Sequence, residues 1–167
     1  QTENLKEALN KNYSSPEAGF KNIISNQSRI RLLYSKNKNT LQSKILDQKN
    51  EEVKVLLQDP SLDASILDSH GNTLLHFAAL NPNQEIFNLI LQKIPDSVNV
   101  ANNEGFTPLH FAAAENQKNH VRELLKNGGN ILASNADTIK NGITPLNFLA
   151  FNASKEDPLN LSVLQKY

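Results

Sequence analysis

Residues Gly71–Ala79 read GNTLLHFAA, and 34 positions further along the chain residues Gly105–Ala113 read GFTPLHFAA. A third copy, GITPLNFLA, follows at residues 142–150 after a spacing of 37 residues. Self-similarity at a fixed period of roughly 20 to 50 residues is typical of arrays in which one small structural unit stacks on the next. The sequence therefore predicts an elongated array of repeated units.

Each copy contains signals for the ends of helices. The glycine allows a tight turn with positive φ, the threonine can cap a helix, and Pro108 suits a first helical position. The segment that follows predicts a short helix whose alanines let neighbouring helices approach closely. Val121, Leu124 and Leu125 predict a second helix, which Gly128 ends. One unit is thus helix, turn, helix and loop, and the fold class is all-α.

These residues resemble the ankyrin repeat, whose signature is Thr-Pro-Leu-His-x-Ala and whose period is about 33 residues. The resemblance covers roughly residues 40–167: a degenerate repeat at 40–67 and clearer repeats at 68–101, 102–134 and 135–167. It implies an ankyrin-repeat solenoid that binds partner proteins through a concave face of hairpin tips and first helices.

The last repeat departs from the family pattern. It has four extra residues before Gly142, Asn147 in place of the histidine, and Leu149 in place of an alanine. We expect its hairpin to protrude and its second helix to lie between Pro158 and Leu164. Repeat arrays normally finish with an atypical capping unit, so either this copy is the cap or further chain follows, and we expect the second.

Residues 1–39 match no family and predict helices. A first helix is expected between residues 2 and 13, and Ser15-Pro16 begins a second. The apolar residues of the second helix recur every three to four positions: Phe20, Ile23, Ile24, Ile30, Leu33 and Tyr34. We expect this N-terminal helical extension to pack as a cap on the first repeat. Its basic residues Lys21, Arg29 and Arg31 leave attachment to lipid or nucleic acid as an alternative.

Composition excludes several classes of protein. Lysine plus arginine and aspartate plus glutamate both number 17, cysteine is absent, and no apolar run approaches the ~18 residues of a membrane span. Net charge therefore argues against nucleic-acid binding, and stability must come from packing without disulfides. We expect a cytoplasmic monomer without membrane contact.

Catalytic and metal-binding patterns are missing from the sequence. His76 and His110 lie at equivalent repeat positions and not four residues apart on one helix, as a zinc motif would require. The ankyrin resemblance implies that each bonds the threonine hydroxyl three residues before it. Nucleophile-elbow, phosphate-loop and dinucleotide motifs do not occur. We predict no enzyme activity, no cofactor, no metal and no small-molecule substrate.

Mapping each repeat onto the family pattern gives the candidate partner-binding residues. They occupy the hairpin tips and the exposed ends of the first helices: Ser69, His70, Asn72, Leu80, Asn81, Asn103, Glu104, Phe106, Ala114, Glu115, Lys140, Asn141, Ile143, Phe151 and Asn152. Among them Leu80, Phe106, Ile143 and Phe151 are expected to form an exposed apolar stripe, which commonly marks an interaction site. The alternative is that they pack beneath the lengthened third hairpin or against a downstream element.

The function predicted from the sequence is that of a protein-interaction module without chemistry of its own. The alternative is a regulatory or targeting segment of a larger enzyme whose catalytic domain lies outside these residues. The chain also contains 24 asparagines. Irregular ankyrin sequences with this bias are similar to effectors that intracellular bacteria deliver into host cells, so a host protein is one expected partner.

Overall fold

A computed structural model describes residues 16–134 and 143–153. This part of the chain contains helices and no strand. The helices in chain order are α2 (Pro16–Ser35), α3 (Leu41–Leu46), α4 (Asn50–Leu57), α5 (Leu74–Ala79), α6 (Gln84–Lys93), the 3-10 turn η1 (Pro95–Ser97), α7 (Pro108–Ala114), α8 (Lys118–Lys126) and α9 (Pro145–Ala153).

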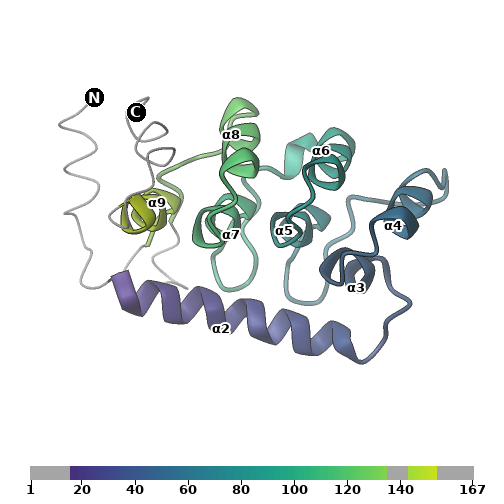
Figure 1. Ribbon diagram of the computed structural model, residues 1–167, viewed down its shortest axis with the longest axis horizontal. Coiled ribbons are helices and arrows are strands. Elements are labelled where there is room, and N and C mark those ends of the chain that lie inside the picture. Colours follow the sequence, from purple (N-terminus) through teal and green to yellow (C-terminus); the bar gives the residue numbers. More distant parts are fainter. Residues whose placement is uncertain (1–15, 135–142, 154–167) are drawn as a thin grey trace.

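The helices from α3 to α9 form two layers of a right-to-left array in Figure 1. Helices α3, α5, α7 and α9 lie in one row and pack on one another in chain order, while α4, α6 and α8 lie in a second row. Each of α3, α5 and α7 also packs on the helix that follows it. The arrangement confirms the predicted all-α solenoid of helix–turn–helix units.

Local chemistry explains where the first-row helices begin. The Thr73 hydroxyl accepts hydrogen bonds from the backbone N–H groups of Leu75 and His76, and His76 Nδ1 accepts one from the backbone N–H of Thr73 at 3.0 Å. Thr107 and His110 repeat this reciprocal cap at α7, where Pro108 occupies the first turn. Such caps satisfy backbone donors that a helix leaves unpaired at its start. The histidine–threonine contact predicted from the sequence is thereby confirmed.

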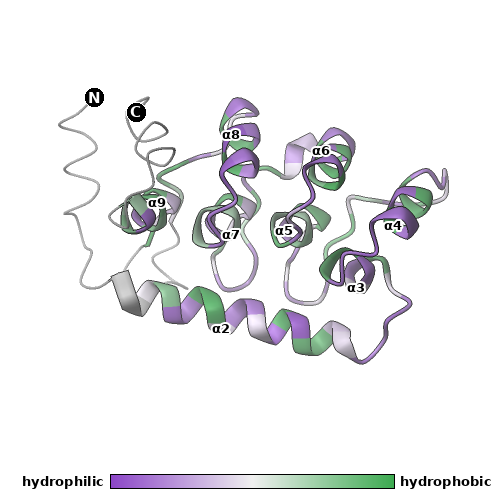
Figure 2. Cartoon of the chain, viewed as in Figure 1, coloured by the Kyte–Doolittle hydropathy of each residue, from purple (hydrophilic) through white to green (hydrophobic). Residues whose placement is uncertain are grey.

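The core follows the first row of helices. Every residue of α5 is buried, and so are six of the seven residues of α7. Ala78, Ala79, Ala112 and Ala113 have no exposed surface, which confirms that small side chains let these helices approach closely. In Figure 2, α5 and α7 are largely green, the colour of apolar residues, whereas the loop between α2 and α3 is purple, the colour of polar residues.

Helix α2 lies across the array instead of capping one end of it. In Figure 1 it begins beside α9, passes the loops that precede α7 and α5, and ends near α3. It contacts α3, as expected for an extension packed on the first repeat, but it also contacts α7 and α9. We call the surface that it covers the inner face: helices α3, α5, α7 and α9 with the hairpin loops at 68–73 and 102–107.

The amphipathic pattern of α2 correctly predicts a helix, but it only partly predicts which residues of the helix face the solenoid. Ile23 and Ile30 are buried as expected, whereas Ile24 is 54% exposed and Leu33 is 37% exposed. The inward positions between the two isoleucines are instead taken by Asn26 and Gln27. The helix expected between residues 2 and 13, the protruding hairpin and the second helix of the last repeat lie outside the described residues.

Candidate functional site

The structure divides the predicted partner-binding residues by exposure. Ser69, His70, Asn103 and Glu115 are exposed; Glu104, Ala114, Phe151 and Asn152 are half-buried; Asn72, Leu80, Asn81, Phe106 and Ile143 are buried. Lys140 and Asn141 lie outside the described residues. The surface that remains available therefore consists mainly of the tips of the two hairpins and the end of α7.

The expected apolar stripe is wrong, because three of its four members belong to the core. Phe106 is 2% exposed, with its ring centroid 5.5 Å from that of His110, and its carbonyl accepts a hydrogen bond from His76 Nε2 at 2.8 Å. Ile143 lies against α2, where a Cβ added to Gly19 would overlap its side chain. Leu80 is buried at the end of α5.

Three other predicted contact residues have structural roles. Asn81 donates to the carbonyl of Ile45 at 3.0 Å and so ties α5 to α3. Asn152 donates to the carbonyl of Ala113 at 2.8 Å and ties α9 to α7. The half-buried Phe151 ring packs on the Phe20 ring of α2, with centroids 4.5 Å apart. These contacts stabilise the stacking of neighbouring elements.

The hairpin tips are built by one acidic or amide side chain in each repeat. Asp68 Oδ1 accepts from the backbone N–H groups of His70 and Asn72, at 2.9 and 2.8 Å. Asn102, 34 residues later, accepts in the same way from Glu104 and Phe106, both at 3.0 Å. Asp and Asn side chains stabilise turns by such bonds. The tips are therefore ordered platforms that present His70, Asn103 and Glu104.

A buried polar chain joins these platforms to α2, and the sequence reasoning missed it. Asn102 Nδ2 donates to Asn26 Oδ1 of α2 at 3.0 Å and to Asn72 Oδ1 of the neighbouring hairpin at 2.9 Å. Further along α2, the Tyr34 hydroxyl donates to Asp68 Oδ2 at 2.9 Å. The signal available in the sequence was the equivalent position of Asp68 and Asn102 in successive repeats.

Between α2 and the hairpin tips lies a small pocket of about 110 Å³, lined by Asn26, Arg29, Ile30, His70, Asn103 and Glu104. Arg29 of α2 pairs with Glu104 across it, with 3.4 Å between the charged atoms. Three of the six lining residues were predicted as partner-binding residues. We call His70, Asn103 and Glu104, together with Ser69 and Arg29, the hairpin-tip surface.

The ionisable groups around this surface reflect the packing. Burial, followed by the hydrogen bond to Asp68 and its charge, raises the pKa of Tyr34, which keeps the phenol protonated as a donor. Burial lowers the pKa values of His76 and His110 to about 4, so both rings are neutral at pH 7. Neither histidine is placed for proton transfer at the surface.

We predict that Asn102→Ala lowers the free energy of unfolding by about 2 kcal/mol, because buried partners in both the hairpin and α2 lose their hydrogen bonds. Urea unfolding followed by circular dichroism would measure the loss. The matched control is the exposed neighbour Asn103→Ala, for which a change within about 0.5 kcal/mol is expected. Equal effects of the two substitutions would contradict the role assigned to the buried chain.

Within residues 16–134 and 143–153, no group of three or more histidine, aspartate or glutamate side chains is placed to hold a metal ion. None of the described helices has the length and apolarity that crossing a membrane requires.

The fold and the hairpin-tip surface define a helical repeat protein that presents ordered loops along one edge. Residues 41–135 match the family model described as ankyrin repeats in three copies. The chain therefore belongs to the ankyrin-repeat family, whose members generally serve as protein–protein interaction modules and whose fold is typically non-catalytic. The match ends before the copy at 142–150.

Among solved structures, one chain of the complex titled "Bd0816 Predatory Endopeptidase from Bdellovibrio bacteriovorus in complex with immunity protein Bd3460" is similar, with 27% identity and a TM-score of 0.61. The similarity covers 74% of the present chain and 63% of that chain. A comparison with curated protein sequences finds no match.

Proposed function

We propose that this protein binds a partner protein through the hairpin-tip surface. The observation that carries the proposal is that residues from two successive hairpins and from α2 meet around one pocket while remaining accessible to solvent. Side-chain hydrogen bonds to Asp68 and Asn102 already order the loops in the free protein. Binding a partner therefore carries little further entropy cost for ordering them.

The chemistry of the surface favours a polar patch on the partner. Glu104 and Arg29 offer opposite charges, and His70 and Asn103 offer hydrogen-bonding groups, whereas Ile30 at the base of the pocket is buried. Rim charges of this kind mainly set the rate and specificity of association. An enzyme is one class of partner that fits, since the similar solved chain belongs to a complex of an endopeptidase with an immunity protein. The asparagine-rich composition makes a host-cell protein a second class to test.

We predict that Glu104→Arg weakens partner binding at least tenfold, about 1.4 kcal/mol, while the stability changes by less than about 1 kcal/mol, because the Arg29–Glu104 pair is exposed. A partner is first isolated with the unmodified chain, and its affinity for each variant is then measured by calorimetry. Asp96→Arg is the matched control, since it makes the same charge change on the exposed turn η1, which packs on α6. Equal affinities of the unmodified chain and Glu104→Arg would exclude the hairpin-tip surface.

A further inference from the structure

Helix α2 is held on the inner face by few apolar contacts for its length. From Gly19 to Ser35, two large apolar side chains are fully buried, Ile23 and Ile30. Phe20 and Tyr34 add half-buried rings near the two ends, 4.9 Å from Phe148 and 5.1 Å from Phe77 between ring centroids. By contrast, every residue of the six-residue helix α5 is buried. The hold on α2 is therefore weaker per residue than the contacts within the solenoid.

The centre of the α2 contact is polar and incompletely satisfied. Asn26 accepts its hydrogen bond from Asn102, whereas the buried Gln27 Nε2 has no partner among the described residues. An unpaired buried donor disfavours the arrangement that buries it. Meanwhile Ile24 and Leu32, which is 67% exposed, point away from the inner face. Part of the apolar surface of α2 therefore remains exposed to solvent and does not contribute to its packing on the inner face.

The hairpin loops do not depend on α2 for their internal bonds. Without α2, Asn102 keeps its bonds to Glu104, Phe106 and Asn72. Asp68 likewise keeps the backbone donors of its own loop when Tyr34 is removed. The inner face is therefore built by the solenoid itself.

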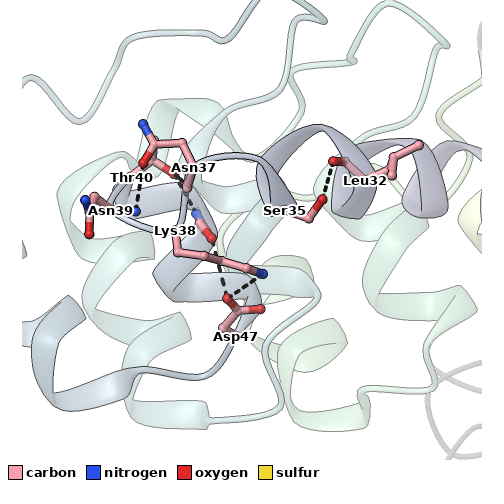
Figure 3. A network of polar contacts seen from close by, with 8 residues as sticks. Leu32, Ser35, Asn37, Lys38, Asn39, Thr40 and Asp47 are labelled. Atoms are coloured by element: carbon pink, nitrogen blue, oxygen red, sulfur yellow. Dashed lines mark hydrogen bonds and ion pairs between the residues drawn. The ribbon is translucent and has the colours of Figure 1, made fainter.

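The loop between α2 and α3 is anchored on the α3 side, as Figure 3 shows. Lys38 pairs with Asp47 at the end of α3, at 3.1 Å, and the Thr40 hydroxyl that caps α3 donates to the carbonyl of Asn37. The Ser35 hydroxyl, in contrast, bonds within α2 to the carbonyl of Leu32. Separation of α2 would leave the start of α3 intact.

Charge complementarity specifies which kind of segment fits the inner face. Helix α2 carries three basic residues, Lys21, Arg29 and Arg31, and one acidic residue, Glu17, near its start. The hairpins that it crosses contribute Asp68 and Glu104 to the contact. A matching segment is a basic helix with aliphatic residues seven positions apart and an amide side chain between them.

We propose that the inner face is a binding site for a basic amphipathic helix of a partner protein, and that α2 is the built-in occupant which such a helix displaces. The inference rests on the proposed function and names the structural element of the partner. The inner face lies beneath α2 and shares the hairpin residues Ser69, His70, Asn103 and Glu104 with the hairpin-tip surface. Arg29 belongs to α2 itself, so a displacing helix would take the place of Arg29 opposite Glu104.

The first test is hydrogen exchange of the full chain followed by mass spectrometry. The amides of α2 are expected to exchange at least tenfold faster than those of α5 and α7, because α2 separates while the solenoid stays folded. Exchange of α2 at the same rate as α5 and α7 would overturn the proposal, since it would make α2 an inseparable part of the fold.

The second test uses a fluorescent peptide of residues 16–36 and three forms of the full chain. The double variant Ile23→Asp, Ile30→Asp, whose own α2 is weakened, is expected to bind the peptide at least tenfold more tightly than the unmodified chain. The matched control Ile24→Asp, Leu32→Asp changes outward residues of the same helix and should behave like the unmodified chain.

Three outcomes would overturn the proposal: equal peptide affinity for the two double variants, loss of the helical signal of the solenoid in the Ile23, Ile30 variant, and dimerisation of the unmodified chain by exchange of α2 in light scattering. The last outcome would assign the site to a second copy. All three forms of the chain in the peptide test retain Glu104. Failure of the Glu104→Arg prediction would therefore exclude the hairpin-tip surface without changing the comparison between these three forms.

Discussion

Replacing Phe106 with alanine is expected to lower the free energy of unfolding by about 3–5 kcal/mol, as is usual when a buried aromatic side chain is deleted. The ring is 2% exposed and packs against His110 and Phe111 in the core. Its removal leaves a cavity at the junction between the hairpin and α7. Urea denaturation followed by circular dichroism would measure the change.

The matched control for this prediction is Ile66→Ala. Ile66 is also a large apolar residue in a loop, but it is 63% exposed, so a change within about 0.5 kcal/mol is expected. If Phe106→Ala were as mild as Ile66→Ala, the ring would have to lie at the surface, as the sequence pattern had suggested.

The second large effect is a loss of stability in mild acid. Burial lowers the pKa values of His76 and His110 to about 4 in the folded protein, whereas the ordinary value is 6.5. Below pH 6.5 these histidines bind protons in the unfolded chain but stay neutral in the folded chain. The free energy of unfolding therefore falls as the pH falls from 6.5 towards 4. Between pH 7 and pH 5 we expect a loss of about 2 kcal/mol for each histidine.

Burial is the main cause of the lowered histidine pKa values, and the hydrogen bond at Nδ1 also favours the neutral ring. Nδ1 of His110 accepts from the backbone N–H of Thr107 at 2.9 Å, so a proton on Nδ1 would face another donor. Nε2 donates to the carbonyl of Ile143 at 3.1 Å. The variant His110→Asn tests this, because Asn147 already makes the same contact to Thr144 in the last copy. Its stability should depend less on pH; an unchanged pH profile would contradict the assignment.

The repeated part of the fold could be predicted from the sequence because its signals are local. Turn glycines, capping threonines and the period of 34 residues lie within single units, and the structure places Thr73 and Thr107 at the starts of α5 and α7 as predicted. The histidine role followed from the family resemblance. Stacking then follows because each unit buries its apolar residues against the next.

The position of α2 could not be predicted, because its packing partners lie far from it in sequence. Periodicity indicated a helix but could not show that Asn26 would face inward to meet Asn102, 76 residues away. Ile24 fits the apolar period equally well and lies outside. When a buried hydrogen bond determines which side of a helix faces its neighbour, the hydrophobic pattern alone predicts the wrong side.

The candidate site could be predicted only in part, because some of its residues are also buried by contacts between distant parts of the chain. The repeat register correctly placed Ser69, His70 and Asn103 on exposed hairpin tips. The repeat register wrongly placed Phe106 and Ile143 at the surface. Each backbone carbonyl accepts a hydrogen bond from the histidine Nε2 of the preceding repeat, and this bond holds the residue against the neighbouring unit. The family pattern describes one unit, whereas this contact joins two.

The position of α2 across the inner face can be tested most directly by paramagnetic relaxation enhancement. The chain has no cysteine, so Ser28→Cys, exposed on α2, gives a single site for a nitroxide label. With α2 across the inner face, this label is expected to broaden the amide signals of residues 102–106 strongly. A label at Lys93→Cys, at the end of α6, is expected to cause no broadening of comparable size there. Unbroadened signals at 102–106 with the Ser28 label would contradict this position of α2 and show that the helix lies elsewhere.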